Sequence, residues 1–482
     1  MCVRPFPFRP SLNDSPPKFH KYEDKVLDKN VNRIHSILIF ITALIFCACN
    51  SNPSTQNVQQ FSPPDWSYDA SIYEVNVRQF TDEGTLQAFE KRLPELKELG
   101  VKILWFMPLQ PIGEKNRKGG LGSYYSIRDY QAISPAYGAA EEFAALVKKI
   151  HANGMFVMID WVANHTAWDH HWTLEHPEWY TRDTNGNFTP PVADWSDVID
   201  LNYDEKPLWN AMIEAMAFWV REFDVDGFRC DVAGMVPLEF WLQARKELEE
   251  IKPLFMLAEA WEPELHQAFD MTYSWSTHHL MKDVAQGQKT ANALAAALKK
   301  EQRMYGANDF RMQFTTNHDE NSWNGTVFER LGDAAAAFAV FSATIPGMPL
   351  IYSGQEAGLN KRLAFFEKDR IDWREHPFRA LYRKLIQLKR NNTALWNGKK
   401  SGAVDLVSHK TEKNVLVFSR ENDVDQVIVA INFKGEHSSF EIEKAKWRGS
   451  YSSLFDGEEV VLDGVVSTEL EPWGYLVLVR KN

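Results

Sequence analysis

The feature that most restricts the fold is a regular alternation of two kinds of segment from residue 70 onward. Short apolar runs, of a length that suits buried strands, are followed by longer stretches with apolar residues at helical spacing. In residues 139–152, for example, one helical face carries Phe143, Leu146, Val147 and Ile150. Alternation of this kind is typical of a parallel sheet whose strands are linked by helices.

The alternation predicts eight strands, at residues 72–80, 101–108, 155–162, 225–232, 254–260, 269–275, 310–316 and 349–353. Helices are expected at residues 85–99, 139–152, 206–223, 237–250, 333–344 and 376–390, with a long helical region that ends near residue 304. Eight such units predict a closed (β/α)8 TIM barrel. The competing architecture is an open doubly wound sheet, which carries a glycine-rich turn after its first strand. Residues 78–81 read Arg-Gln-Phe-Thr, which is no such turn and favours the barrel.

Two further segments depart from the barrel pattern. Residues 166–200 are rich in Trp, His, Asp and Pro without clean periodicity, which indicates a short inserted loop domain after the third strand. Beyond residue 396, short apolar runs bounded by turns predict antiparallel strands at residues 415–418, 427–432, 438–442 and 475–479. We therefore expect an α/β fold with a barrel over residues 66–395 and a C-terminal antiparallel β-sandwich over residues 396–482.

The N-terminal region reads as an export signal. Residues 37–48 form an uncharged apolar run that is short for a membrane span and suits a signal peptide. The following Phe-Cys-Ala-Cys resembles a relaxed bacterial lipobox with Cys49 as the lipidated residue. Residues 1–49 are thus expected to be an extension plus lipoprotein signal, and residues 50–65 a polar linker. The alternative is a buried hydrophobic strand. The expected location is the cell envelope, on the periplasmic or outer-membrane face, with a lipid anchor in the membrane.

Composition narrows the classes of partner. The formal net charge is −12, which argues against nucleic acid, because phosphate binding needs clustered Lys and Arg. A neutral polymer remains compatible with this charge. Of the four cysteines only Cys230 lies in the predicted barrel, so a disulfide framework is excluded there. The 17 Trp and 15 Tyr suit either sugar stacking or a large aromatic core.

Acidic residues stand at or just beyond the ends of four predicted strands. Asp160 is near the end of the third strand, Asp231 of the fourth, Glu259 of the fifth, and Asp319 follows the seventh. One such residue is often a helix cap or a calcium ligand. Four that face one barrel mouth repel each other and lose hydration, a cost that indicates a functional site.

Glycoside cleavage requires two carboxyl groups, one ionised and one protonated. Arg229 precedes Asp231 by two residues and therefore points to the same barrel face, where its charge is expected to keep Asp231 ionised. Glu259 follows apolar residues and is the candidate for a raised pKa. Asp319 is a third acid, placed to hold sugar hydroxyls.

These segments resemble the signature regions of the α-amylase superfamily (glycoside hydrolase family 13), and the N-terminal region suggests a bacterial lipoprotein member. Residues 107–111, 198–202 and 347–356 resemble further regions of the same superfamily. The resemblance implies that Asp231 is the nucleophile, Glu259 the general acid/base and Asp319 the stabiliser of the transition state. It also implies substrate-binding roles for Tyr125, Asp160, His165, Arg229 and His318. For the two histidines the alternative is a satisfied core residue.

The sequence also departs from the superfamily. Many members carry Lys-His three and four residues after the nucleophile, where this chain has Gly234 and Met235. This weakens the case for a lysine contact to the sugar beyond the cleavage point and for a calcium site. Asn164 stands where members often have a calcium ligand. We expect no cofactor for the chemistry and leave a structural calcium ion at Asn164 open.

The expected function is that of a retaining α-glycoside hydrolase acting on α-glucans or maltooligosaccharides through a covalent glycosyl-enzyme intermediate. A transglycosylase and an exo-α-glucosidase are alternatives on the same site, because a second sugar can replace water and loop shape decides product length. A non-catalytic glucan-binding lipoprotein is the alternative from another class. It would be expected to lack Asp231 or Glu259, both of which are present.

Overall fold

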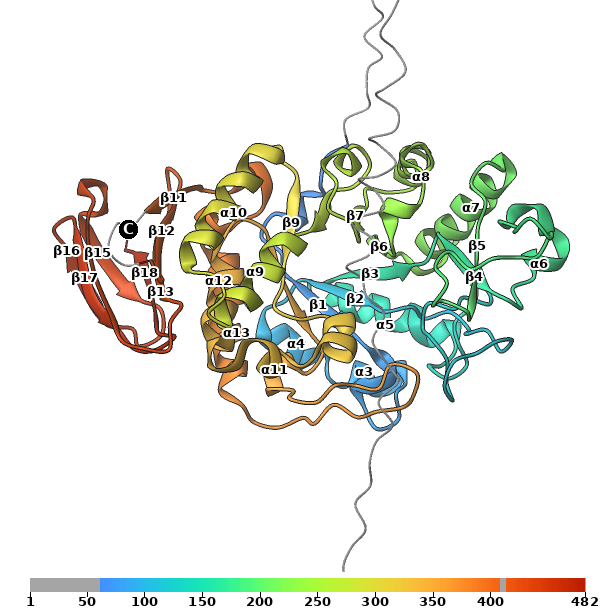
Figure 1. Ribbon diagram of the computed structural model, residues 1–482, viewed down its shortest axis with the longest axis horizontal. Coiled ribbons are helices and arrows are strands. Elements are labelled where there is room, and N and C mark those ends of the chain that lie inside the picture. Colours follow the sequence, from blue (N-terminus) through green and yellow to red (C-terminus); the bar gives the residue numbers. More distant parts are fainter. Residues whose placement is uncertain (1–60, 408–412, 482) are drawn as a thin grey trace, which may run out of the picture. The chain divides into compact units, whose positions relative to one another are not determined.

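The computed structural model describes residues 61–407 and 413–481. Eight parallel strands close into a barrel in the order β1-β10-β9-β8-β7-β6-β3-β2 (Figure 1). They are β1 (Ile72–Val75), β2 (Ile103–Phe106), β3 (Phe156–Trp161), β6 (Gly227–Cys230), β7 (Phe255–Ala258), β8 (Met271–Tyr273), β9 (Phe310–Gln313) and β10 (Met348–Tyr352). Ile72 pairs with Ile103 on one side and with Leu350 on the other, which closes the ring. The predicted (β/α)8 barrel is confirmed.

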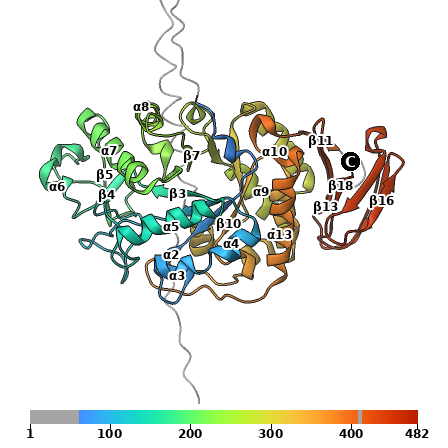
Figure 2. The same cartoon turned by 180° about the vertical axis from the view of Figure 1, so that it is seen from behind.

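The helices of the described residues are α2 (Val77–Phe80), α3 (Leu86–Glu90), α4 (Leu93–Leu99), α5 (Ala140–Ala152), α6 (Trp172–Glu175), α7 (Lys206–Phe223), α8 (Leu238–Glu249), α9 (Trp275–Ala285), α10 (Ala291–Met304), α11 (Val327–Leu331), α12 (Ala335–Thr344) and α13 (Pro377–Asn391). Seen from behind, α4, α5 and α13 lie outside the strands (Figure 2). Phe143 of α5 packs edge-on against Phe106 of β2, with ring centroids 6.0 Å apart. The amphipathic helices thus bury their apolar faces against the barrel.

Two predicted elements differ in detail. The strand expected over residues 72–80 ends at Val75, and the helix α2 follows it. The helix expected over residues 85–99 is divided into α3 and α4, with Pro94 in the first turn of α4, where its missing N–H costs nothing. Gly100 ends α4 with φ of 94°, a left-handed conformation that glycine adopts without strain.

The barrel interior is packed rather than hollow. Its lower layers are apolar and include Ile72, Ile103, Met158, Leu257 and Met348. At the carboxyl ends of the strands the interior turns polar, with buried charged side chains. This change of character along the barrel axis places the charged groups at the end where barrel enzymes hold their active sites.

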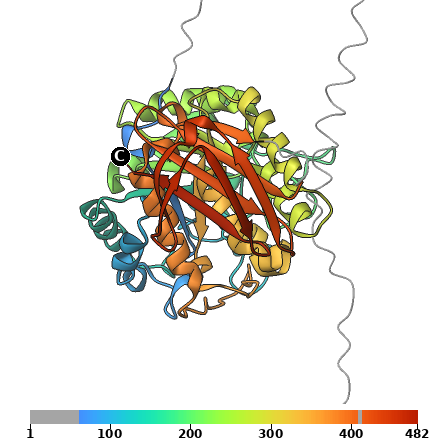
Figure 3. The same ribbon diagram turned by 90° about the vertical axis from the view of Figure 1, so that its left-hand side faces the viewer.

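The C-terminal strands form two antiparallel sheets, which are viewed face-on in Figure 3. One contains β11 (Ala403–Val407), β12 (Val415–Glu421), β13 (Gln426–Asn432), β18 (Tyr475–Arg480), β15 (Gly449–Ser453) and β16 (Glu459–Leu462). The other pairs β14 (Ser438–Glu443) with β17 (Val465–Leu470), and both contribute to one apolar core. Phe433 packs on Phe338 of α12 at 4.8 Å, and Arg420 Nη1 donates to the carbonyl of Thr344 at 3.0 Å. The predicted C-terminal antiparallel β domain is confirmed.

The segment after β3 contains a short antiparallel hairpin of β4 (His165–Ala167) and β5 (Val198–Asp200). The predicted signal, Cys49 and most of the linker lie outside the described residues. Within residues 61–407 and 413–481, none of the helices has the length and apolar character needed to cross a membrane.

Candidate active site

Arg229 is the centre of the polar layer. It lies on β6 with no exposed surface, and its Nη1 contacts Asp160 Oδ1 at 2.8 Å and Asp231 Oδ1 at 3.1 Å. Its Nη2 lies 2.9 Å from Glu259 Oε2, a charge contact without good hydrogen-bond alignment, and its Nε donates to Tyr273 Oη at 3.1 Å. One buried guanidinium therefore holds three carboxylates, the kind of arrangement that offsets the cost of burying charge.

Asp231 and Glu259 occupy equivalent places on neighbouring strands. Each is the first residue after its strand, β6 or β7, and its amide still donates to the preceding strand, to Trp161 for Asp231 and to Cys230 for Glu259. The ladder therefore fixes both backbones while the side chains enter the mouth. Val232 adopts φ of 37°, strained for a β-branched residue, and its amide donates to Glu259 Oε2 at 2.9 Å.

The two carboxyl groups perturb each other. Burial and the facing Glu259 carboxylate raise the pKa of Asp231 well above its usual range, and Arg229 offsets this only in part. Burial also raises the pKa of Glu259. Arg229, which was expected to keep Asp231 ionised, does lower the pKa of Asp231, but its charge is shared among three carboxylates and does not outweigh burial and Glu259. The pair takes up a proton at higher pH than separate carboxylic acids and titrates as one unit.

Asp319 and His318 form a second charged group. His318 Nε2 lies 3.3 Å from Asp319 Oδ2, and its Nδ1 lies 2.5 Å from Oε1 of Glu74 on β1. Burial opposes the imidazolium, but the charges of Asp319 and Glu74 outweigh it and raise the pKa of His318 well above its usual range. In turn the His318 charge outweighs burial at Asp319 and lowers the pKa of that carboxyl. This acid is therefore held ionised, unlike the coupled pair.

Replacing Glu74 with Gln tests this ion pair. Because the pKa of His318 is raised in the folded state, its charge stabilises the fold fully below the ordinary histidine pKa of about 6.5, and this contribution is lost as pH rises through the folded value. We expect Glu74→Gln to lower the free energy of unfolding by about 1–3 kcal/mol at pH 6. The loss should shrink in alkaline solution. Urea unfolding at pH 6 and pH 9 measures both values, and an equal loss at the two pH values would contradict a charged His318.

Tyr125 and Asp160 join these groups into one site. The Tyr125 hydroxyl donates to Asp160 Oδ2 at 3.0 Å and lies 2.7 Å from His318 Nε2, and its ring stacks on the His318 ring at 5.4 Å. Trp105 Nε1 donates to the same Asp160 oxygen at 3.2 Å. The structure thus brings together seven predicted residues: Tyr125, Asp160, Arg229, Asp231, Glu259, His318 and Asp319.

Three residues of the site were missed by sequence reasoning, namely Glu74, Trp105 and Tyr273. Each lies within an apolar strand and contacts a predicted residue. Glu74 did carry a signal, because it is the single charged residue in the strand Ile72–Val75 and is fully buried. A lone carboxylate in a buried strand needs a partner.

His165 and Asn164 lie beside the group, at the start of β4 and just before it. His165 is buried, which lowers its pKa to about 3 and leaves the imidazole neutral at neutral pH, although a hydrogen bond to the Tyr125 backbone partly opposes this. Asn164 Nδ2 lies 3.3 Å from His165 Nδ1. Within the described part of the chain no three His, Cys, Asp or Glu side chains form a group that could hold a metal. Calcium at Asn164 stays a prediction, since calcium also binds amide and backbone carbonyl oxygens.

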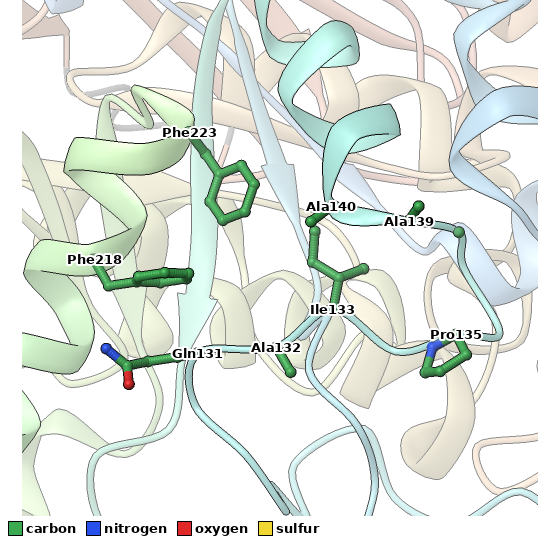
Figure 4. A pocket seen from close by; sticks show the side chains of 9 residues that line it. Gln131, Ala132, Ile133, Pro135, Ala139, Ala140, Phe218 and Phe223 are labelled. Atoms are coloured by element: carbon green, nitrogen blue, oxygen red, sulfur yellow. The ribbon is translucent and has the colours of Figure 1, made fainter.

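Two features lie apart from this site. Asp226, the residue before β6, accepts from the amide of Val157 at 2.8 Å and lies 2.7 Å from His151 Nε2. It therefore lies at the end of β6 opposite to Asp231. A surface hollow of about 630 Å³ is lined by Ile133, Phe218 and Phe223 among others (Figure 4). None of the predicted site residues lines it.

Comparison with known proteins identifies the family to which this fold belongs. The model of the alpha amylase catalytic domain matches residues 49–195 and 178–402, and that of the alpha amylase C-terminal all-beta domain matches residues 406–478. A noncanonic maltogenic alpha-amylase, AmyB from Thermotoga neapolitana, is 32% identical with a TM-score of 0.79, over 86% of this chain and 99% of that one. An alpha-amylase from Lactobacillus plantarum is 32% identical with a TM-score of 0.78, over 86% of this chain and all (100%) of that one.

The alpha-amylase MalA of Haloarcula japonica is 28% identical over 401 residues, which cover 78% of this chain. The aligned part is 57% of MalA, so the chain spans little more than half the length of this relative. The barrel, its carboxylate site and these matches define the class, a glycosidase with a catalytic (β/α)8 domain followed by an all-β domain. The chain belongs to the alpha-amylase family.

Proposed function

We propose that this protein hydrolyses α-glucosidic bonds in α-glucans or maltooligosaccharides and retains the anomeric configuration. The observation that carries the proposal is the pair Asp231 and Glu259, held by one buried guanidinium at the barrel mouth. The two carboxyl groups supply the nucleophile and the acid that a two-step displacement needs. The printed names of the relatives, alpha-amylase and maltogenic alpha-amylase, support an α-glucan substrate.

In the first step an oxygen of Asp231 attacks the anomeric carbon while the bond from that carbon to the leaving oxygen breaks. Glu259 gives its proton to the leaving oxygen, and the sugar remains as an ester on Asp231. The chemistry therefore needs one proton on the carboxyl pair. The raised pKa values of Asp231 and Glu259 favour a singly protonated pair over a doubly ionised one. The mechanism requires that this proton is on Glu259 and the negative charge on Asp231 when the substrate is attacked.

In the second step a water oxygen attacks the same carbon and the ester bond to Asp231 breaks. Glu259, now ionised, takes the proton that the water loses, which restores the starting state. Asp319, held ionised by His318, is placed to bind sugar hydroxyls and the positive charge that develops on the ring. Tyr125 presents an aromatic face on which the reacting ring stacks.

Product analysis tests this proposal. The full-length chain is incubated with maltohexaose, starch and pullulan, and the products are separated by size. Shorter oligosaccharides support hydrolysis. In the maltohexaose incubation, products longer than the substrate would show transfer to a second sugar. An absence of turnover on every α-glucan would contradict the proposal.

We also propose that the chain is anchored in the cell envelope through a lipid on Cys49. Support comes from the apolar residues 37–48, the cysteine that follows and the polar residues after it. Expressed in a bacterial host, the full chain is expected to enter the detergent phase of a Triton X-114 extract and to take up labelled palmitate. Cys49→Ala should abolish the labelling, whereas Cys230→Ala, a buried cysteine of β6, should not. Equal labelling of the parent and Cys49→Ala would contradict the anchor.

A further inference from the structure

A row of aromatic rings leads outward from Tyr125. Phe365 is parallel to Tyr125 at 6.3 Å, Trp323 lies 5.2 Å from Phe365, and Phe366 lies 5.8 Å from Trp323. We call Trp323, Phe365 and Phe366 the aromatic wall. All three side chains are half-buried, so part of each remains open to solvent. Three large aromatic groups at the edge of a polar site are not explained by core packing alone.

The wall is held rigidly by polar contacts of its backbone. Arg78 Nη1 donates to the carbonyl of Phe365 at 3.1 Å, and the amide of Leu121 donates to the carbonyl of Phe366 at 2.9 Å. The segment that contains Trp323 is hydrogen-bonded to the segment that contains Phe365 and Phe366, because the Leu363 amide donates to Asn321 Oδ1 at 2.9 Å. A platform built in advance loses little conformational entropy when a ligand binds.

Topology and contacts place the wall on the Tyr125 side of the mouth, with Phe365 and Phe366 three strands from β7 and Trp323, which packs on Phe365, two strands from it. Phe365 and Phe366 follow β10, Trp323 follows β9, and Tyr125 follows β2. In the closed order of the barrel, β10 and β2 flank β1, and β1 lies four strands from β7, which carries Glu259. Glu259 protonates the leaving oxygen in the proposed mechanism. A ring over Tyr125 therefore has its leaving group toward Glu259 and its other neighbour toward the wall.

We propose that the aromatic wall binds the glucosyl units that precede the reacting ring, on the side that does not leave. The inference rests on the proposed function and names the part of the substrate that this surface recognises. Flat aromatic faces stack on the apolar faces of pyranose rings, and a row of them suits a chain of such rings. The substrate is then an oligosaccharide with at least one glucosyl unit beyond the reacting one.

This binding mode has a consequence for the product. An exo-α-glucosidase that releases glucose from the non-reducing end has no sugar on that side of the reacting ring. An enzyme that uses the wall instead keeps two or more units together, so the shortest product from the non-reducing portion is maltose. The wall therefore favours release of maltose or longer products over glucose.

The test compares two chromogenic substrates on the full-length protein. p-Nitrophenyl α-glucoside offers only the reacting ring, whereas p-nitrophenyl α-maltotrioside adds two units on the wall side. Trp323→Ala removes a ring that contacts Phe365 and Phe366 and leaves the stack of Tyr125 on His318 in place. We expect kcat/KM for the maltotrioside to fall about tenfold and that for the glucoside to stay within about twofold. Phe366→Ala should act in the same way.

Phe455→Ala is the matched control, since it removes a half-buried aromatic ring of the C-terminal domain that packs on Tyr475. It should change neither value. An equal fall on both substrates for Trp323→Ala and Phe366→Ala, or no fall on either, would overturn the role of the wall. If the parent enzyme releases p-nitrophenol from neither substrate and cleaves no α-glucan, the proposed function itself fails and the inference falls with it.

Discussion

Replacing Asp231 with Asn is expected to lower kcat on maltohexaose by about 10⁴-fold or more, because an amide does not form the glycosyl ester through which the reaction passes. The fold should survive the change. Asp231 is one of three carboxylates on Arg229, and removal of its charge relieves the repulsion from Glu259 that raises its pKa. We therefore expect the Tm of Asp231→Asn to equal or exceed that of the parent, as at other sites where function is kept at the expense of stability.

Asp226→Asn is the matched control for this change. Asp226 is an acidic residue of the same segment, but at the opposite end of β6, where it accepts from Val157 and pairs with Lys252 at 3.0 Å. Its replacement should lower the Tm and leave kcat within about twofold of the parent. Measurement of kcat and Tm for both variants separates chemistry from stability. Comparable loss of activity in the two variants would contradict the assignment of Asp231.

Glu259→Gln should produce a loss that depends on the leaving group. On starch we expect kcat to fall about 10³-fold or more, since the leaving sugar oxygen then departs without a proton. An α-maltosyl fluoride needs no such proton, so formation of the ester on Asp231 should proceed on this substrate at a rate much closer to that of the parent. Asp231→Asn, by contrast, should lose activity on starch and on the fluoride to the same extent.

Rapid-mixing measurement of fluoride release distinguishes the two roles. A burst of fluoride followed by slow turnover is expected for Glu259→Gln, because Glu259 is also the base that activates water in the second step. Equal loss on starch and on the fluoride would contradict the general acid role. A Glu259→Asp variant, which keeps the carboxyl group on a shorter side chain, should recover part of the starch activity.

The barrel was predictable because the alternation of strand and helix periods is a local property of the sequence. Recognising it requires no knowledge of which distant residues are in contact. The bounds of α7 (Lys206–Phe223) agree with the expected range, since its apolar face is continuous and its last residue precedes Asp224 in a left-handed conformation. The barrel strands other than β10 are shorter than expected. Asp231 and Glu259 directly follow the last residues of β6 and β7, and their amides still donate to the neighbouring strand while their side chains enter the mouth.

The C-terminal sheets were only partly predicted. β12 and β13 are almost wholly buried and read as strands, whereas β11 contains no buried residue and β16 only Leu462. Their position depends on pairing with a neighbour, which a local pattern does not contain. The same reason explains β15 and β17, which were also missed.

The site shows where sequence reasoning reached its limit in physical terms. The motif residues lie together as expected, because strand ends of a closed barrel meet at one mouth. The contact of Glu74 with His318 joins residues 244 positions apart, and no local pattern reveals it. The electrostatics differed as well. Sequence spacing placed Arg229 beside Asp231 alone, whereas in the folded chain the guanidinium also contacts Asp160 and Glu259.

The most direct test of the central claim, retaining hydrolysis of α-glucans by this carboxylate pair, is the anomeric form of the first product. The full-length protein is mixed with maltohexaose and the released reducing ends are followed by proton NMR before mutarotation equilibrates them. Two displacements at one carbon predict that the α-anomer appears first and the β-anomer only later. Initial appearance of the β-anomer would show a single displacement and would contradict the assignment of Asp231 as nucleophile.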